Sequence, residues 1–264
     1  MAINNVETLS ILLLLLLLTL TNCTSAMKYG ATNSAPNTPG GKVFDQYVGK
    51  AFAAQTLERA TKFIWKLFEQ PTPADRKNVS SVHVYISDFS DGYAYANVPL
   101  NAINVSATAI DRQYNPRSSS KNYFQWLMHH EVTHLFQWYG EGKIRPGLAE
   151  GIADYVMVKS GTFPMEQYAK PGAGERWDEG YGVTERFLEY CDSLKPKFTV
   201  ELNKRMRYGY DDSYFKEMIG KPVDQLWNEY KAKYKTAAIA AGDGEEGRKG
   251  YYPLGFGDGV IGFY

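Results

Sequence analysis

The sequence predicts a single α+β domain, with a small mixed or antiparallel sheet in its first half and helices in its second half. β-Branched and aromatic residues are concentrated in three short runs, at 82–86, 93–96 and 102–105, which is typical of strands. From residue 180 to about 234, apolar residues recur with helical spacing instead. Strands followed by helices indicate an α+β fold, and 264 residues with 44% hydrophobic content suffice for one sizeable core.

The N-terminus predicts export from the cell. An apolar run from Ile11 to Leu20 is too short to span a bilayer comfortably, and small residues follow it at 24–26. We therefore predict a signal peptide over residues 1–26. A retained membrane anchor is the alternative, because Glu7 stands where a signal peptide usually carries Lys or Arg.

The remaining chain divides by composition. Residues 27–41 are small, polar and rich in Gly and Pro, which predicts a flexible lead-in. The domain is predicted over 42–235, beginning with a helix whose apolar residues recur between 44 and 70. Residues 236–264 form a Gly-rich tail without periodicity, which we expect to lie outside the core.

The most specific motif is His-Glu-x-x-His at residues 130–134. Residues four apart lie on one face of a helix, so His130 and His134 can bind one metal ion. Glu131 is then placed to act as the general base on a zinc-activated water. The alternative is a metal-free helix whose histidines are solvated or bonded to carbonyls. The large apolar residues around the motif predict burial, however, and a buried His pair without a metal or charged partner is costly.

A second helix is predicted to supply the third zinc ligand. Pro146 is tolerated at a first helical position, and the spacing of apolar residues continues to Lys159. Glu150 and Asp154 are four apart and share a face of this helix. Glu150 is the expected ligand, with Asp154 accepting the second ring N–H of a ligating histidine. The opposite assignment, with Asp154 on the metal, stays open, as does a role for both acids as ordinary solvated residues.

The two motif segments resemble the plant basic secretory protein family and, more broadly, the gluzincin branch of zinc peptidases. The resemblance covers about residues 42–235 and is carried by segments 60–65, 129–138, 146–156 and 177–184. It implies a zincin-like fold, secretion into the apoplast or cell wall, metallopeptidase activity and a link to plant defence. It also places His130, His134 and Glu150 at the ligand positions and Glu131 at the catalytic position. The family's name refers to basic proteins, whereas this chain has a formal net charge of zero.

These observations together predict a secreted zinc peptidase that acts on peptides or proteins. An edge strand, 93–96 or 102–105, would bind an extended substrate by strand addition. Tyr181, which lies between two glycines, is the candidate donor to the oxyanion, with a packing role as the alternative. Two other functions stay open: a non-catalytic, zinc-stabilised defence or binding protein, with carbohydrate as a candidate ligand, and a zinc hydrolase of non-peptide bonds.

Charge and cysteine content indicate which binding partners and which covalent links to expect. The chain has 29 basic and 29 acidic residues, and removal of 1–26 takes away only Glu7. This balance argues against nucleic acid and stable membrane association as partners, and we expect a monomer. Cys23 would leave with the signal peptide, so Cys191 would have no partner for an intramolecular disulfide. Asn78 and Asn104 begin glycosylation sequons, which matter only in a secreted chain.

Overall fold

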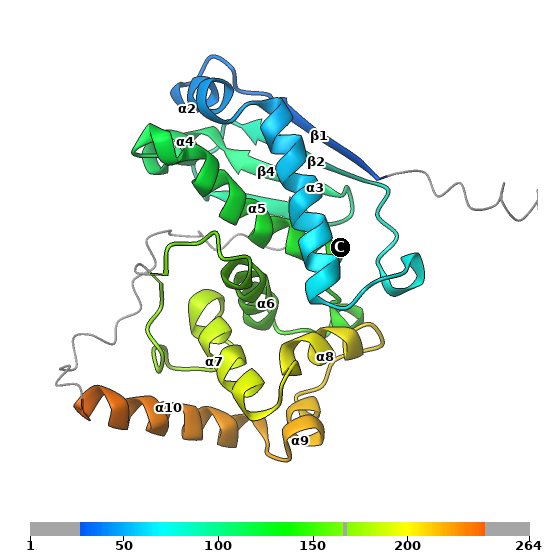
Figure 1. The fold of residues 1–264 in the computed structure, drawn as a ribbon, viewed down its shortest axis with the longest axis vertical. Helices are drawn as coiled ribbons and strands as arrows, with labels where there is room; N and C mark the ends of the chain where they lie inside the picture. The colour runs from blue at the N-terminus through cyan, green and yellow to red at the C-terminus, as the bar shows by residue number, and fades with distance from the viewer. Residues whose placement is uncertain (1–26, 166–167, 241–264) are drawn as a thin grey trace, which may run out of the picture.

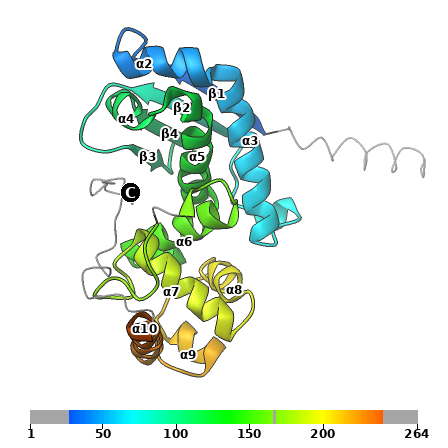
Figure 2. The same ribbon diagram turned by 60° about the vertical axis from the view of Figure 1, so that its left-hand side comes forward.

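The computed structural model describes residues 27–165 and 168–240, with side chains to residue 235. The strands are β1 (Lys28–Asn33), β2 (Ser81–Ser87), β3 (Ala94–Asn97) and β4 (Ala102–Ser106). The α-helices are α2 (Pro39–Val43), α3 (Lys50–Leu67), α4 (Ala107–Gln113), α5 (Ser120–Phe136), α6 (Pro146–Lys159), α7 (Tyr181–Leu194), α8 (Phe198–Arg205), α9 (Ser213–Ile219) and α10 (Val223–Ala240). Short 3-10 turns lie at Pro73–Asp75, Arg117–Ser119 and Gly140–Gly142. The sheet and α2–α5 form one half of the molecule, and α6–α10 form the other (Figures 1 and 2).

The sheet has four strands in the order β1-β2-β4-β3. β1, β2 and β4 are parallel, and β3 pairs antiparallel with β4 at the edge. Alternate residues of β2 are buried, as expected for a strand with one face on the core. Helices α3 and α5 pack beside one another against the sheet (Figure 1). All three predicted strands are confirmed. β1 and β3 are the two edge strands, so of the two strands expected to bind substrate only β3 lies at an edge.

The predicted flexible lead-in at 27–41 is wrong. Residues 28–33 form β1, which pairs along its whole length with β2, from Lys28 opposite Ser81 to Asn33 opposite Ile86. α2 then begins after Thr38, whose hydroxyl accepts a hydrogen bond from the Gly41 amide at 3.0 Å. Main-chain pairing stabilises this segment although its side chains show no strand pattern.

The predicted helix from 44 to 70 is divided in two. Residues Phe44–Val48 form a single π-helical turn, and α3 begins only at Lys50. Gly49 joins them with φ at 76°, a backbone angle that glycine adopts readily and other residues rarely do. The apolar spacing is similar on both sides of this break, so the sequence pattern did not reveal it.

The helical second half is confirmed. α6 lies between α5 and α7, and its glycines allow α7 to approach closely. A Cβ on Gly147 would lie 1.9 Å from the carbonyl oxygen of Asp178, and one on Gly151 would lie 2.3 Å from Thr184 Cγ2. α10 continues to Ala240, beyond the predicted start of the tail at 236.

Two predictions concern residues outside the described part of the chain: the signal peptide at 1–26 and the remainder of the tail, 241–264. Within residues 27–165 and 168–240, no helix is both long and apolar enough to span a lipid bilayer.

Candidate metal centre

The first part of the site is the C-terminal half of α5. Every side chain from Trp126 to Phe136 is buried, because the helix lies between the sheet, α3 and α6. His130 and His134 are separated by one helical turn and therefore project from the same face towards α6. The expectation that residues four apart share one face of this helix is thus confirmed.

α6 supplies the acidic residues. It begins at Pro146, and Glu150 and Asp154 follow on the side that faces α5. Both carboxylates are buried, with Glu150 8% and Asp154 2% exposed. Buried carboxylates require charged or hydrogen-bonding partners, and here the histidines of α5 provide them.

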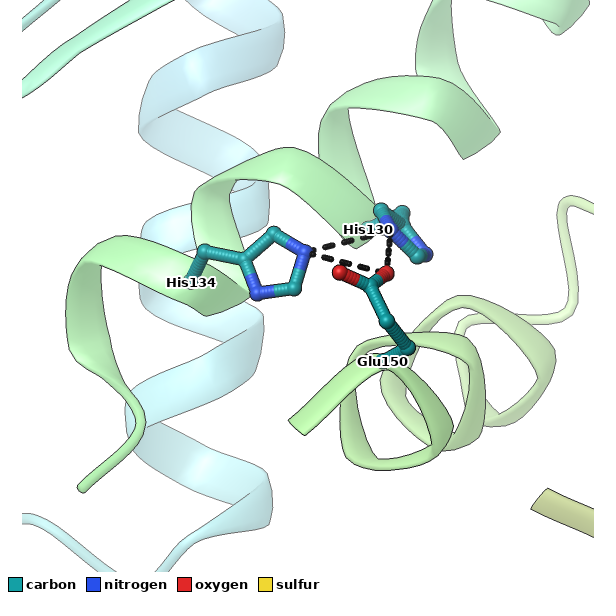
Figure 3. Close-up of side chains that lie close together, drawn as sticks. All are labelled: His130, His134 and Glu150. Atoms are coloured by element: carbon teal, nitrogen blue, oxygen red, sulfur yellow. Dashed lines mark hydrogen bonds and ion pairs between the residues drawn. The ribbon is translucent and has the colours of Figure 1, made fainter. Parts of the chain in front are cut away.

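Three ligand atoms converge at the contact of the two helices (Figure 3). The Nε2 atoms of His130 and His134 are 3.2 Å apart. Glu150 Oε2 lies 3.2 Å from His130 Nε2 and 3.6 Å from His134 Nε2. Ligand atoms bound tetrahedrally to zinc, each about 2.0–2.2 Å from it, are about 3.3–3.6 Å from one another. The three side chains therefore fit a zinc ion in both chemistry and spacing, and this set of three leaves a fourth position.

Asp154 contacts the opposite side of the His130 ring. Its Oδ1 lies 2.8 Å from His130 Nδ1, and its Oδ2 accepts a hydrogen bond of 2.8 Å from the Tyr168 hydroxyl. A carboxylate oxygen can only accept here, so Nδ1 carries the proton and Nε2 faces Glu150. This geometry favours Glu150 as the ligand and Asp154 as the residue that orients His130.

The charges of the cluster stabilise one another. Burial disfavours protonation of His130, but Asp154 and Glu150 outweigh burial and raise its pKa well above the usual value. Burial also favours the neutral form of Glu150, yet His134 and His130 hold its pKa well below the usual range. The imidazoles and carboxylates therefore favour one another's charged forms.

Glu131 lies in the same buried environment, with 2% of its surface exposed. Burial raises the pKa of its carboxyl, and Glu150 and Asp154 add to this, whereas His130 and His134 oppose it. A carboxylate in such surroundings is a stronger base than one in water.

Tyr181 is brought beside His130 although 51 residues separate them in sequence. The two rings are stacked with centroids 6.0 Å apart and planes 15° apart. Tyr181 opens α7 with φ at 45°, directly after Gly180 at 103°. A positive φ is strained for tyrosine and is retained where the surrounding structure dictates it, often at functional sites.

His129 is directed away from the cluster. Its Nδ1 lies 2.8 Å from the Gln125 carbonyl, and its ring meets Phe63 edge-on at 5.5 Å. It therefore does not occupy the fourth position of a metal held by its neighbours.

Three residues near the ligands were missed by the sequence analysis. Gln137 contacts His134 Nδ1 at 3.0 Å, Tyr139 donates a hydrogen bond to the His134 carbonyl, and Tyr168 contacts Asp154. Gln137 follows His134 by three residues, so its proximity could have been inferred. The position of Tyr168 depends on the loop between α6 and α7 and had no local signal.

The two sequons differ in their surroundings. Asn78 is exposed in the loop before β2. Asn104 is half-buried in β4, between Tyr85 of β2 and Tyr95 of β3. Asn78 is the more accessible of the two predicted sites.

Comparison with known proteins agrees with the motif resemblance. A family model described as "Peptidase of plants and bacteria" matches residues 24–230. A basic secretory protease of Boswellia serrata is 45% identical over 58 residues, which are 22% of this chain and 66% of that relative, just under two thirds of its length. No solved structure matches the chain. Because the family match extends over most of the sequence, the chain belongs to the basic secretory protein family of plant and bacterial peptidases.

Proposed function

We propose that this protein is a secreted zinc-dependent peptidase of zincin-like fold. The observation that carries the proposal is the convergence of His130 Nε2, His134 Nε2 and Glu150 Oε2 at separations suited to tetrahedral zinc. Family membership independently supports peptidase activity.

The proposed mechanism assigns one task to each residue. Zinc at this site would supply Lewis acidity to the scissile carbonyl and lower the pKa of a water molecule towards about 7. Glu131 takes the proton from the attacking water and passes it to the leaving amine. The Tyr181 hydroxyl, on the ring stacked against His130, donates to the oxygen of the scissile carbonyl as negative charge develops there. Asp154 keeps the His130 ring oriented throughout.

The sheet supports the binding of an extended peptide. β3 is one of the two edge strands, so one of its sides does not pair within the sheet, and it packs against helix α5, which carries both histidines. A substrate strand hydrogen-bonded to this edge would lie next to the metal centre. Substrate specificity would then depend on side-chain pockets along β3, where Tyr95 is 43% exposed.

Export, location and modification complete the proposal. The family name supports secretion, and we infer release into the apoplast or cell wall after cleavage near Ala26, with a role in plant defence. Glycosylation is proposed at Asn78 because it is exposed, and less readily at Asn104 because neighbouring strands flank it.

The decisive experiment compares metal content and hydrolysis in the same preparations. Glu131→Gln should retain one zinc per chain while peptide hydrolysis falls by about 10²–10⁴-fold, the usual contribution of a general base. Glu58→Gln, on a largely exposed part of α3, is the control and should retain both properties. Full activity in the Glu131 variant would refute the mechanism. A zinc-loaded wild-type protein without hydrolysis of any peptide would favour the non-catalytic, zinc-stabilised binding protein instead.

A further inference from the structure

Gln137 is a buried amide at the end of the metal-binding helix. It is the C-cap of α5, its main-chain N–H donates to the Thr133 carbonyl at 2.8 Å, and none of its surface is exposed. From this position its side chain folds back to His134, where its Nε2 lies 3.0 Å from the imidazole Nδ1. The amide nitrogen also lies 3.3 Å from the Tyr139 hydroxyl, which itself donates to the His134 carbonyl.

The oxygen of this amide differs from its nitrogen. Gln137 Oε1 is buried and lacks a partner among the described residues. A buried carbonyl oxygen without a donor costs about 1–3 kcal/mol, so hydrogen bonding does not by itself favour this orientation of the amide over the reverse one. A half-turn of the amide exchanges its oxygen and nitrogen without changing its shape.

Metal binding by His134 would require the turned orientation of the Gln137 amide. A neutral imidazole carries one proton, and His134 can offer the Nε2 lone pair to a metal only if Nδ1 carries that proton. The neighbour of Nδ1 must then be a hydrogen-bond acceptor. Gln137 Oε1 would be that acceptor after the half-turn, at the position now occupied by Nε2.

At His130, the other proposed ligand, an acceptor oxygen already faces Nδ1. His130 Nδ1 faces Asp154 Oδ1, and the second oxygen of Asp154 is bonded by a tyrosine, Tyr168. Around His134 the amide of Gln137 takes the place of the carboxylate, but the Tyr139 hydroxyl lies against the same amide atom as the imidazole and not against the second one. Each histidine thus has a side chain with a potential acceptor oxygen beside its Nδ1, charged for His130 and neutral for His134.

We propose that Gln137 is a positioning residue for zinc, whose side-chain oxygen accepts the Nδ1–H of His134 and fixes the tautomer that binds the metal. The proposal rests on the zinc site put forward above, and it adds a residue that neither the motif nor the family match identifies. Loss of the outer acceptor of a ligating histidine weakens metal binding by about 10–100-fold.

Zinc affinity tests the proposal without reference to catalysis. Competition with a chromophoric chelator gives the dissociation constant of zinc for wild type, Gln137→Met, Gln137→Glu and the control Gln55→Met, which alters an exposed residue of α3. Met keeps the length of the side chain but removes the acceptor, so affinity should fall about 10–100-fold. Glu keeps an acceptor oxygen and should bind zinc at least as tightly as wild type, and the control should not change.

The outcomes separate the two proposals. Zinc binding by Gln137→Met within threefold of wild type would overturn the role of Gln137, while the zinc site itself would stand. Equal losses in the Met and Glu variants would show that Gln137 only fills space, which also overturns the proposal. If wild type bound no zinc, both proposals would fail. Thermal melting of the metal-free proteins verifies that each variant is folded.

Discussion

Removal of the Asp154 carboxylate tests whether Asp154 binds zinc itself or orients a histidine that does. Asp154→Ala removes the acceptor of two donors, the buried His130 Nδ1–H and the hydroxyl of the half-buried Tyr168, each 2.8 Å from an Asp154 oxygen. An unsatisfied buried donor costs about 1–3 kcal/mol, so the metal-free variant should lose at least about 1–3 kcal/mol of its free energy of unfolding through His130, with a smaller addition from Tyr168. Asp154→Asn retains one acceptor oxygen, and we expect it to lose about half as much.

Zinc affinity should follow a different order. Asp154→Ala removes an outer hydrogen bond, which predicts a loss of about 10–100-fold. Glu150→Ala removes the oxygen that lies 3.2 and 3.6 Å from the two imidazole nitrogens, so its loss should be larger. Urea denaturation of metal-free protein and chelator competition measure the two quantities. A larger loss of zinc affinity in Asp154→Ala than in Glu150→Ala would reverse the assignment and make Asp154 the ligand.

Three further changes test other parts of the structure. Gly151→Ala places a methyl group 2.3 Å from Thr184 Cγ2, which requires a shift of about 1 Å, and the overpacking cost of about 1–3 kcal/mol should exceed the gain of about 1 kcal/mol in helix propensity. Its melting temperature should fall below that of Gly92→Ala, where no atom lies within 4 Å of the added methyl group, and equal values would contradict the close packing of α6 and α7. Glu185 is fully buried, neither carboxylate oxygen has a hydrogen-bond partner among the described residues, and burial raises its pKa well above 4.5. The contribution of Glu185 to stability is therefore present below pH 4.5 and is lost as the pH rises towards the pKa of Glu185 in the folded protein. Relative to Glu185→Gln, the free energy of unfolding of wild type should fall by up to about 1.4 kcal/mol per pH unit. If the free energies of unfolding of the two proteins changed in parallel from pH 4.5 to 7.5, this reasoning would be refuted. Tyr181→Phe keeps the ring on His130 but removes the hydroxyl, so kcat should fall about 10²–10³-fold with zinc affinity unchanged, whereas an unchanged kcat would limit Tyr181 to packing.

The candidate metal ligands could be predicted because their geometry is local. His130 and His134 are one helical turn apart, as are Glu150 and Asp154, and a helix places each pair on one face whatever the surrounding fold. The sequence could not decide which acid binds the metal. That choice depends on how α6 sits against α5, and only the structure shows Glu150 at both Nε2 atoms and Asp154 at Nδ1.

The errors concern segments whose conformation depends on distant contacts. β1 has little strand pattern of its own and exists because β2 provides a parallel partner 53 residues further along the chain. The break at Gly49 preserves the apolar spacing on both sides, so periodicity did not detect it. α4 was missed altogether, although Ser106 caps it by accepting from the Ala109 amide at 3.0 Å.

The placement of Tyr181 shows how small residues build a site from distant segments. Gly147 and Gly151 lie one turn apart on α6, and both contact the segment that leads into and begins α7. With side chains at these positions, Asp178 and Thr184 would be displaced outwards, and Tyr181 between them would move with them. Gly180 then provides the turn that directs Tyr181 onto His130. The glycines on either side of Glu150 therefore determine, through packing alone, how far the proposed oxyanion donor lies from the proposed ligands.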